Sequence, residues 1–203
     1  MRKMIAIAGV MIALTMWGCS GGGSPEASLT PEEEQYVRQI AQPATDSLLK
    51  SLKGALLQAI QEGGPVGAVK VCNLKALPLT EGVARQLERV AEVRRTSRKF
   101  RNPRNAPDPN DVKALEYFEE QIQNGKWPPY YIHKTTEKGQ PVYFYYRPLK
   151  VAPLCLNCHG DPANMSPELV STLKQLYPAD RATGYREGDF RGLIRVKVLG
   201  EKG

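Results

Sequence analysis

The sequence predicts an α+β protein in which a long helical region precedes one antiparallel sheet. Apolar residues recur at helical spacing from residue 36 to residue 60. Residues 130–146 hold two short runs of aromatic and branched residues around a turn, and residues 192–198 form a further strand-like run. Helices come first and strands later, an order that favours segregated helices and sheet over alternating βαβ units.

The first helical region has a clear N-terminal signal. Thr30 can cap a helix that has Pro31 at its first position, and Glu33 completes a capping box. We expect Pro43 to kink this helix or to begin a second one, and the glycine pair 63–64 to end it. A long amphipathic helix most often serves packing or a dimer surface, so the sequence also leaves a homodimer open.

The next stretch admits two interpretations. Residues 65–76 fit either a short strand or a helix that starts at Pro65. In both cases Val69 and Cys72 are expected to face inward. Residues 79–93 then predict another helix, because their apolar residues recur at helical spacing.

The C-terminal part predicts two further helices and three strands. Its first helix follows a proline-rich loop over residues 102–110, and either Asp108 or Asn110 can cap it. The remaining elements are a hairpin of residues 130–134 and 142–146 around a turn at 137–140, a helix over 167–177, a loop over 178–188 and the strand 192–198.

The N-terminus has the features of an export signal. A basic start (M-R-K) precedes an apolar run over residues 4–16, which is short for a membrane span. A glycine, Cys19 and a Ser- and Gly-rich stretch follow, which resembles a bacterial lipoprotein cleavage site. We expect a lipoprotein signal peptide over residues 1–18 and lipidation of Cys19. The alternative is an ordinary secretory signal that is cut nearby.

An exported protein of this length is restricted in its number of domains and in its partners. We expect a flexible tether over residues 19–28 and a single domain over residues 29–203, since about 180 mature residues suffice for one core. The expected location is the periplasm or cell envelope, with a lipid anchor in the membrane. The chain carries a net charge of +7, but export makes nucleic acid an unexpected partner and leaves anionic lipid or an acidic redox protein.

Residues 155–160 read C-L-N-C-H-G and contain the attachment signature of a c-type haem, C-x-x-C-H. In this interpretation Cys155 and Cys158 form thioethers with the haem vinyl groups, and His159 is the proximal iron ligand. A redox dithiol and half of a zinc site are the alternatives. A zinc site would need a second ligand pair such as C-x-x-C or H-x-x-x-H, which the sequence lacks. We therefore expect one covalent haem c.

The sequence has four cysteines, and lipid and haem account for three of them. The fourth, Cys72, is a buried inert thiol, half of an intermolecular bridge or a metal ligand. Three side chains compete for the second axial position of the iron, Cys72, His133 and Met165, and a lysine is a less common choice. His133, in the predicted hairpin, is the ordinary choice for a bis-histidine haem and the fallback here. Met165 follows His159 so closely that the chain would have to wrap the ring edge at once.

Residues 85–104 are strongly basic, with eight Arg and Lys residues against two Glu. Most of them are expected on a solvated helix face that runs into a solvated edge strand. Guanidinium groups bind carboxylates bidentately, so one or two arginines are expected to pair with the haem propionates. Arg95 and Arg101 are the candidates.

Eight short segments occur in a characteristic order: V-C-N at 71–73, R-T-S at 95–97, R-N-P-R-N-A-P at 101–107, C-L-N-C-H-G at 155–160, Y-P-A-D at 177–180, G-Y at 184–185, G-D at 188–189 and R-G at 191–192. In this order they resemble a bacterial family of exported c-type haem domains with a PAS-like fold, long catalogued as a domain of unknown function. The resemblance covers nearly all of residues 30–200. It implies a PAS-like antiparallel sheet and an iron held between His159 and Cys72.

Two functions follow from this interpretation. A thiolate ligand stabilises ferric iron, so the chain is expected to be a low-potential one-electron carrier at the cell envelope. The alternative is a redox or gas sensor that binds CO or NO when the thiolate leaves, a function that members of the resembling family suggest by analogy. Such a sensor would signal to a separate protein. We expect no enzyme, because two axial protein ligands close the iron.

Overall fold

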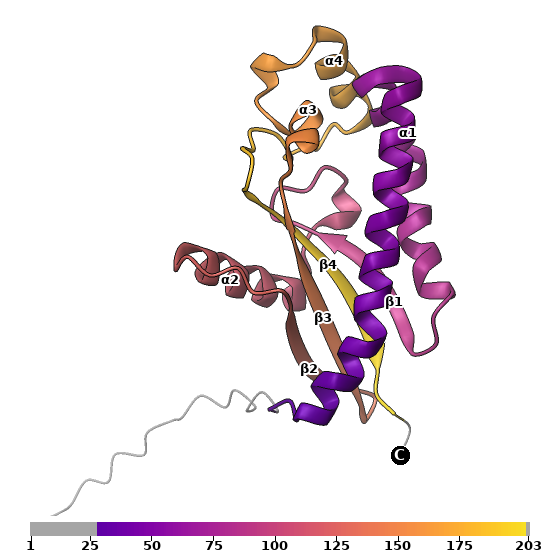
Figure 1. Cartoon of the computed structure of the whole chain (residues 1–203), viewed down its shortest axis with the longest axis vertical. Helices are drawn as coiled ribbons and strands as arrows, with labels where there is room; N and C mark the ends of the chain where they lie inside the picture. Colours follow the sequence, from indigo (N-terminus) through magenta and orange to yellow (C-terminus); the bar gives the residue numbers. More distant parts are fainter. Residues whose placement is uncertain (1–27, 202–203) are drawn as a thin grey trace, which may run out of the picture.

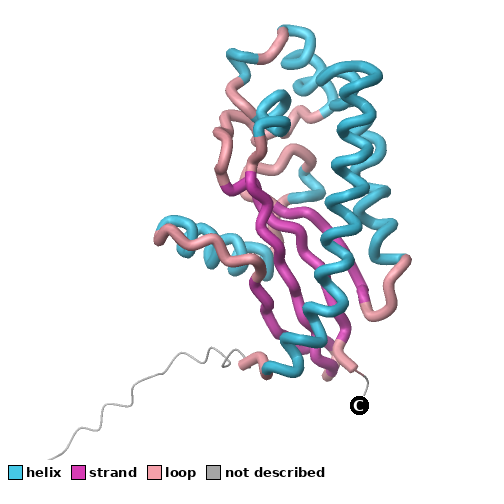
Figure 2. The backbone as a smooth tube through the Cα atoms, in the orientation of Figure 1, coloured by secondary structure: helices cyan, strands magenta, loops and turns pink. Residues whose placement is uncertain are grey.

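A four-stranded antiparallel sheet forms the centre of the protein (Figures 1 and 2). The computed structural model of the chain describes residues 28–201. The predicted signal peptide, Cys19 and all but the last residue of the predicted tether lie outside these residues. The strands are β1 (Val90–Thr96), β2 (Tyr131–Glu137), β3 (Gln140–Lys150) and β4 (Phe190–Leu199), in the spatial order β1-β4-β3-β2.

The predicted hairpin is confirmed as β2 and β3. Their register runs from the pair Tyr131 and Tyr146 to the pair Glu137 and Gln140. Lys138 and Gly139 form the turn with positive φ angles of 52° and 77°, a conformation that suits a tight hairpin. The last strand, β4, lies between β3 and β1 and so joins the hairpin to the first strand in one sheet.

One face of the sheet is covered by α1 (Pro31–Arg85), which starts with the predicted capping box at Thr30 and Glu33. Pro43 neither ends this helix nor begins a second one. The buried packing of the flanking residues on the sheet outweighs the cost of the proline there. The break lies instead at Gly63 and Gly64, where the backbone leaves helical geometry. The two halves of α1, residues 31–62 and 65–85, run in opposite directions (Figure 1).

The stretch after the glycine pair resolves into one helix and one strand. Residues 65–85 are helical throughout, so the helical interpretation of residues 65–76 holds. The predicted helix over 79–93 is wrong beyond Arg85, because Val90 and Val93 belong to β1. Both valines are buried against α1, and their strand pairs with β4. Pairing with β4 and burial on the sheet override the helical spacing of these apolar residues.

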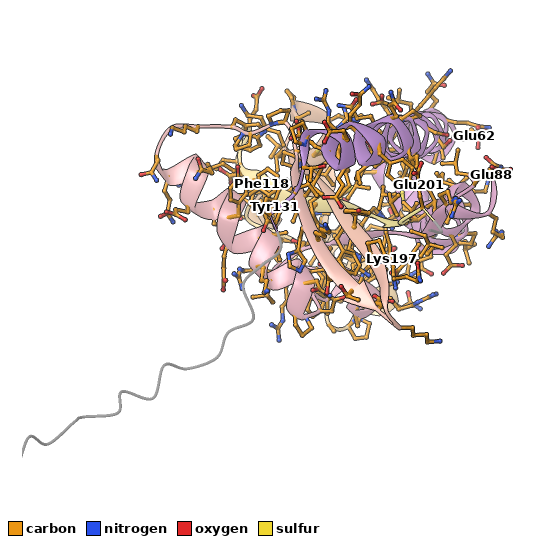
Figure 3. All side chains as sticks on the ribbon, turned by 90° about the horizontal axis from the view of Figure 1, so that it is seen from below. Glu62, Glu88, Phe118, Tyr131, Lys197 and Glu201 are labelled. Atoms are coloured by element: carbon orange, nitrogen blue, oxygen red, sulfur yellow. The ribbon has the colours of Figure 1, made fainter. Side chains whose placement is uncertain are left out.

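The opposite face of the sheet is covered by α2 (Pro109–Gln123). Asp108 caps this helix and Asp111 completes a capping box, so the prediction of Asp108 is confirmed. Its buried side chains pack on the aromatic residues of β2 and β3, as Phe118 and Tyr131 illustrate (Figure 3). The buried residues between α2 and the sheet are Ala114, Leu115, Phe118, Val142, Phe144, Tyr146 and Leu193.

The short elements gather at one end of the sheet, near the turn of α1 (Figures 1 and 2). They are α3 (Leu156–His159), α4 (Pro167–Leu176) and three 3₁₀ turns at Pro103–Asn105, Pro153–Cys155 and Pro162–Asn164. Helices on both faces of an antiparallel sheet confirm the α+β class. Within residues 28–201, none of the helices combines the length and apolar character that a membrane span requires.

Candidate cofactor site

A cavity lies where the two halves of α1 meet the end of the sheet and α3. Its empty space is about 1030 Å³ with the solvent at its mouth included. One wall is apolar and is formed by Leu52, Leu56, Ile60, Ala68, Val69, Ala76, Leu77 and Leu154. The polar lining is Cys72, Asn73, Arg95, Arg101, Asn102, Asn105, Cys155, Cys158, His159, Tyr177 and Arg191.

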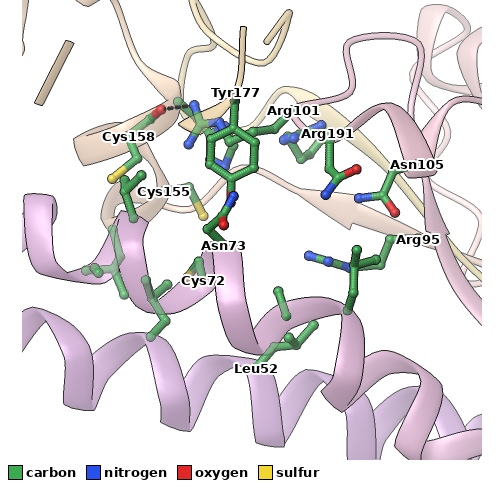
Figure 4. A pocket seen from close by; sticks show the side chains of 18 of the residues that line it. Leu52, Cys72, Asn73, Arg95, Arg101, Asn105, Cys155, Cys158, Tyr177 and Arg191 are labelled. Atoms are coloured by element: carbon green, nitrogen blue, oxygen red, sulfur yellow. Dashed lines mark hydrogen bonds between the residues drawn. The ribbon is translucent and has the colours of Figure 1, made fainter. Parts of the chain in front are cut away.

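The cavity is polarised between two ends. Cys155 and Cys158 lie at one end, and Arg95, Arg191 and Asn105 lie at the other (Figure 4). Such a pocket suits a ligand that is apolar in its middle, reacts with thiols at one edge and is anionic at the opposite edge.

The C-x-x-C-H segment forms α3 and the 3₁₀ turn before it, so both thiols and the imidazole face the same cavity. Within the part of the chain that the structure describes, the three cysteines form no disulfide. Gly160 ends α3, and a Cβ atom there would lie 2.6 Å from the Leu156 carbonyl oxygen. This close contact is a steric reason for glycine directly after His159.

The imidazole of His159 is oriented by the loop that follows α4. Its Nδ1 atom lies 2.7 Å from the carbonyl oxygen of Ala182. A carbonyl only accepts hydrogen bonds, so Nδ1 carries the proton and the lone pair of Nε2 is available to a metal. Burial, with help from the charges of Arg101 and Arg191, holds the pKa of His159 well below its ordinary value, which keeps the ring neutral as a metal ligand requires.

Arg101 links the C-x-x-C-H segment to the loop that follows α4. Its Nε donates to the Asp180 carboxylate at 3.0 Å, and its Nη2 donates to the carbonyl oxygens of Ala182 and Cys158. Figure 4 shows the bond to Cys158. Asp180 in turn accepts the backbone N–H of Ala182 at 2.7 Å. The expected propionate partner Arg101 therefore has three partners within the protein.

Cys72 lies on the second half of α1 and faces the cavity that His159 lines. Burial raises the pKa of this thiol, and the charges of Arg95 and Arg101 act in the opposite direction. Tyr177 and Asn73 stand beside it (Figure 4). The structure thus brings together Cys72, His159 and both cysteines of the haem signature.

Arg95 and Arg191 lie at the end of the cavity away from Cys155 and Cys158 (Figure 4). Burial and the neighbouring charge of Arg191 lower the pKa of Arg95, and its Nε atom is buried without a hydrogen-bond partner. Burial is also the main reason that the pKa of Arg191 is lowered. Arg191 donates to Ser97 Oγ at 3.0 Å and to the Lys99 carbonyl oxygen at 3.1 Å. Two cations with lowered pKa values in one cavity favour an anionic ligand.

The other predicted ligands do not reach the cavity. His133 lies on β2, stacked on Phe144 on the sheet face that α2 covers. Met165 packs with Val69 and Leu169 and does not line the cavity. Of the three candidates for the second axial position, only Cys72 lines the cavity.

Sequence reasoning gave no role to several residues around the cavity, although each lies in a segment that carries the family resemblance: Arg191, Asp180, Tyr177 and Asn105. A signal exists for Arg191, since it precedes Gly192, whose φ is 140°. A Cβ at Gly192 would lie 2.4 Å from the Thr96 carbonyl oxygen. Glycine at position 192 therefore permits the close approach of β4 to β1, and Arg191 lies directly before it. The others depend on loop geometry that the sequence pattern does not specify.

Comparison with known proteins places this architecture in a family. A search of the curated proteins found no match. A solved structure, that of the cyanobacterial haem protein Tll0287, is similar with a TM-score of 0.57 and 24% sequence identity, over 86% of this chain and 99% of the other. The family model of Tll0287-like proteins matches residues 27–198. The chain therefore belongs to the Tll0287-like family.

Proposed function

We propose that the chain binds one covalent haem c in this cavity and carries single electrons at the cell envelope. One observation carries the proposal. The cavity is lined by Cys155, Cys158 and His159 of the haem signature. It is also lined by Cys72, the one cysteine to which neither lipidation nor thioether formation is assigned. The similar structure is that of a haem protein, which supports the same assignment.

The residues of the cavity fit a haem at each of its parts. Haem has an apolar ring, vinyl groups that react with thiols, and two propionates at the opposite edge. The apolar wall suits the ring, Cys155 and Cys158 suit the vinyl groups, and Arg95 and Arg191 suit the propionates. We propose Arg191, beside Arg95, as a partner of the propionates. Arg101 is already ion-paired with the Asp180 carboxylate, whereas Arg191 donates to the neutral groups of Ser97, Lys99 and Tyr185.

Each side chain has a separate role in this proposal. Cys155 and Cys158 hold the group covalently, and His159 and Cys72 are its axial ligands. The bound haem supplies a one-electron couple. A thiolate ligand donates electron density and stabilises the ferric state, so we propose a low reduction potential and a strongly reducing partner.

A redox or gas sensor is the second candidate, and the position of Cys72 favours it. Cys72 follows the break at Gly63 and Gly64, whereas hydrogen bonds tie the segment of His159 to the loop at Ala182. Loss of Cys72 from the iron therefore requires movement of only one half of α1. A site opened in this way would admit CO or NO, and the signal would pass to a separate protein.

The setting of the protein is part of the proposal. We propose export, a lipid anchor on Cys19 and a periplasmic or envelope location, supported by the basic and apolar N-terminus. The PAS-like assignment is supported by the antiparallel sheet, in which the last strand lies between the first strand and a hairpin. We propose an electron carrier or sensor rather than an enzyme.

Expression with and without a c-type haem maturation system tests the proposal. The wild type, denatured and separated by electrophoresis, should retain haem, because thioethers survive denaturation. Cys155→Ala combined with Cys158→Ala should lose it, and Cys72→Ala should keep it. A wild type that loses all haem on denaturation would contradict covalent attachment. Rapid electron exchange without CO or NO binding favours the carrier, and gas binding in one oxidation state favours the sensor.

A further inference from the structure

The loop of residues 180–185 holds the haem segment through one polar network. Gly184 and Tyr185 donate their N–H groups to the carbonyl oxygens of Gly160 and His159 at 2.8 and 2.9 Å. Arg101 and Asp180 form an ion pair inside this network, with only 13% and 11% of their side chains exposed. A pair this well shielded is much less screened by water and salt than a surface pair.

The carbonyl of Ala182 is the centre of the network. It accepts hydrogen bonds from His159 Nδ1 at 2.7 Å and from Arg101 Nη2 at 3.3 Å. The N–H of the same residue is held by Asp180 at 2.7 Å. The ion pair therefore holds Ala182, the residue whose carbonyl orients the imidazole, at both its N–H and its carbonyl group.

We infer that Arg101 and Asp180 are positioning residues that set the orientation and the electron-donating strength of His159. The inference rests on the proposed haem site. A carbonyl that accepts a strong bond from Nδ1–H makes a histidine ligand more basic. The positively charged Arg101 shares the same oxygen, so it weakens that bond and makes His159 a weaker donor. Arg101 thereby raises the reduction potential against the effect of the Cys72 thiolate.

Two substitutions separate this role from a charge effect. Arg101→Gln removes both the charge and the two-pronged guanidinium. Arg101→Lys keeps the charge but has a single nitrogen, which cannot serve Asp180, Cys158 and Ala182 with the same geometry. Arg98→Gln is the matched control, because Arg98 also grips a carboxylate, Glu119, at 2.9 Å but does not line the cavity.

The experiment is a redox titration of the haem-loaded full chain, with NMR of the ferric form to follow the hyperfine-shifted signals of the His159 ring and the haem methyls. At a fixed applied potential, we expect the ferric-to-ferrous ratio to rise about three- to tenfold in both Arg101 variants, where tenfold corresponds to about 59 mV for one electron. The methyl shifts should also move, because they report the plane of the imidazole. Arg98→Gln should change neither quantity.

The outcomes distinguish this inference from the proposed function. A wild type without attached haem would overturn both. A haem-loaded wild type whose potential and methyl shifts are matched by Arg101→Lys would overturn the inference alone, since charge would then be sufficient. If Arg101→Gln does not mature, Arg101→Lys and Asp180→Asn decide it: unchanged methyl shifts in both would overturn the inference, and altered shifts in both support it.

Discussion

Cys72 of α1 and His159 of α3 line one cavity, although most of the sheet lies between them in the sequence. Neither residue belongs to the sheet. β1 leads the chain away from the helix of Cys72, and β3 delivers it to the segment of His159. The sheet thus acts as the frame that brings two helical segments to one cavity.

Arg95→Met should have opposite effects on the stability of the haem-free and haem-loaded proteins. Without haem, a partly desolvated cation repelled by Arg191 is replaced by an apolar side chain. The free energy of unfolding should then rise by about 1 kcal/mol. With haem, the same change removes the proposed partner of a propionate and should lower both stability and reduction potential. Urea unfolding of both forms checks this, and a loss of stability in both would contradict the account.

Gly160→Ala should impair haem attachment. The added Cβ would meet the Leu156 carbonyl oxygen at 2.6 Å and push α3 out of place. The φ of Gly160 is −72°, so the effect is steric and not one of backbone strain. Gly54→Ala is the control, since it lies in α1 with nothing within 4 Å, and should stabilise the helix by about 0.5–1 kcal/mol. Equal haem content in both variants would show that α3 tolerates the methyl group.

Glu33→Gln should destabilise the fold near neutral pH and much less in acid. Burial alone would raise the pKa of Glu33, but hydrogen bonds from Lys134, Thr30 and Tyr143 outweigh it and lower the pKa. The stabilisation is therefore present above the ordinary glutamate pKa and is lost as the pH falls through the lower folded value. We expect a difference of about 1 kcal/mol at pH 7.

Thermal or urea unfolding at pH 7 and pH 3 measures this difference. Glu32→Gln is the control, because Glu32 is its exposed neighbour in the first turn of α1. A Glu33→Gln penalty that stays constant between the two pH values would assign the effect to the shape of the side chain and not to its charge.

Arg195→Met should be one of the most destabilising substitutions outside the cavity. Arg195 is 4% exposed and donates to Asp111 at 3.0 Å, whose side chain is fully buried. Its removal leaves that carboxylate without its main counter-charge, which costs about 3 kcal/mol or more. Arg98→Gln, which breaks an exposed pair, should cost well under 1 kcal/mol. Chemical denaturation gives both values, and similar losses in the two variants would contradict the role of burial.

The sequence predicts most of the elements because their signals are local. The capping residues Thr30 and Asp108 and the turn at Gly139 all act as the pattern indicates. The failure at residues 79–93 has a tertiary cause, because Val90 and Val93 satisfy helical spacing and strand pairing equally well until β4 is present. No local signal distinguishes the two.

The candidate cofactor site shows the same contrast between local sequence signals and tertiary contacts. Cys155, Cys158 and His159 carry a motif. Counting the cysteines singles out Cys72, and the family resemblance implies its role as an iron ligand. The basic stretch over residues 85–104 predicts Arg95 and Arg101 as anion partners, and both line the cavity. Asp180 acts through the Arg101 ion pair and the Ala182 peptide, contacts that form only when distant loops meet. Sequence patterns can name side chains of a known chemistry, but they cannot name the groups that hold those side chains in place.

The most direct test of the haem site is low-temperature EPR of the ferric, haem-loaded protein, compared between the wild type and Cys72→Ala. His133→Ala and Met165→Ala are the matched controls, since neither residue lines the cavity. The account predicts a low-spin thiolate-type signal in the wild type and in both controls, and its loss in Cys72→Ala alone. An unchanged signal in Cys72→Ala, or a signal lost in His133→Ala, would contradict it and assign the second ligand elsewhere.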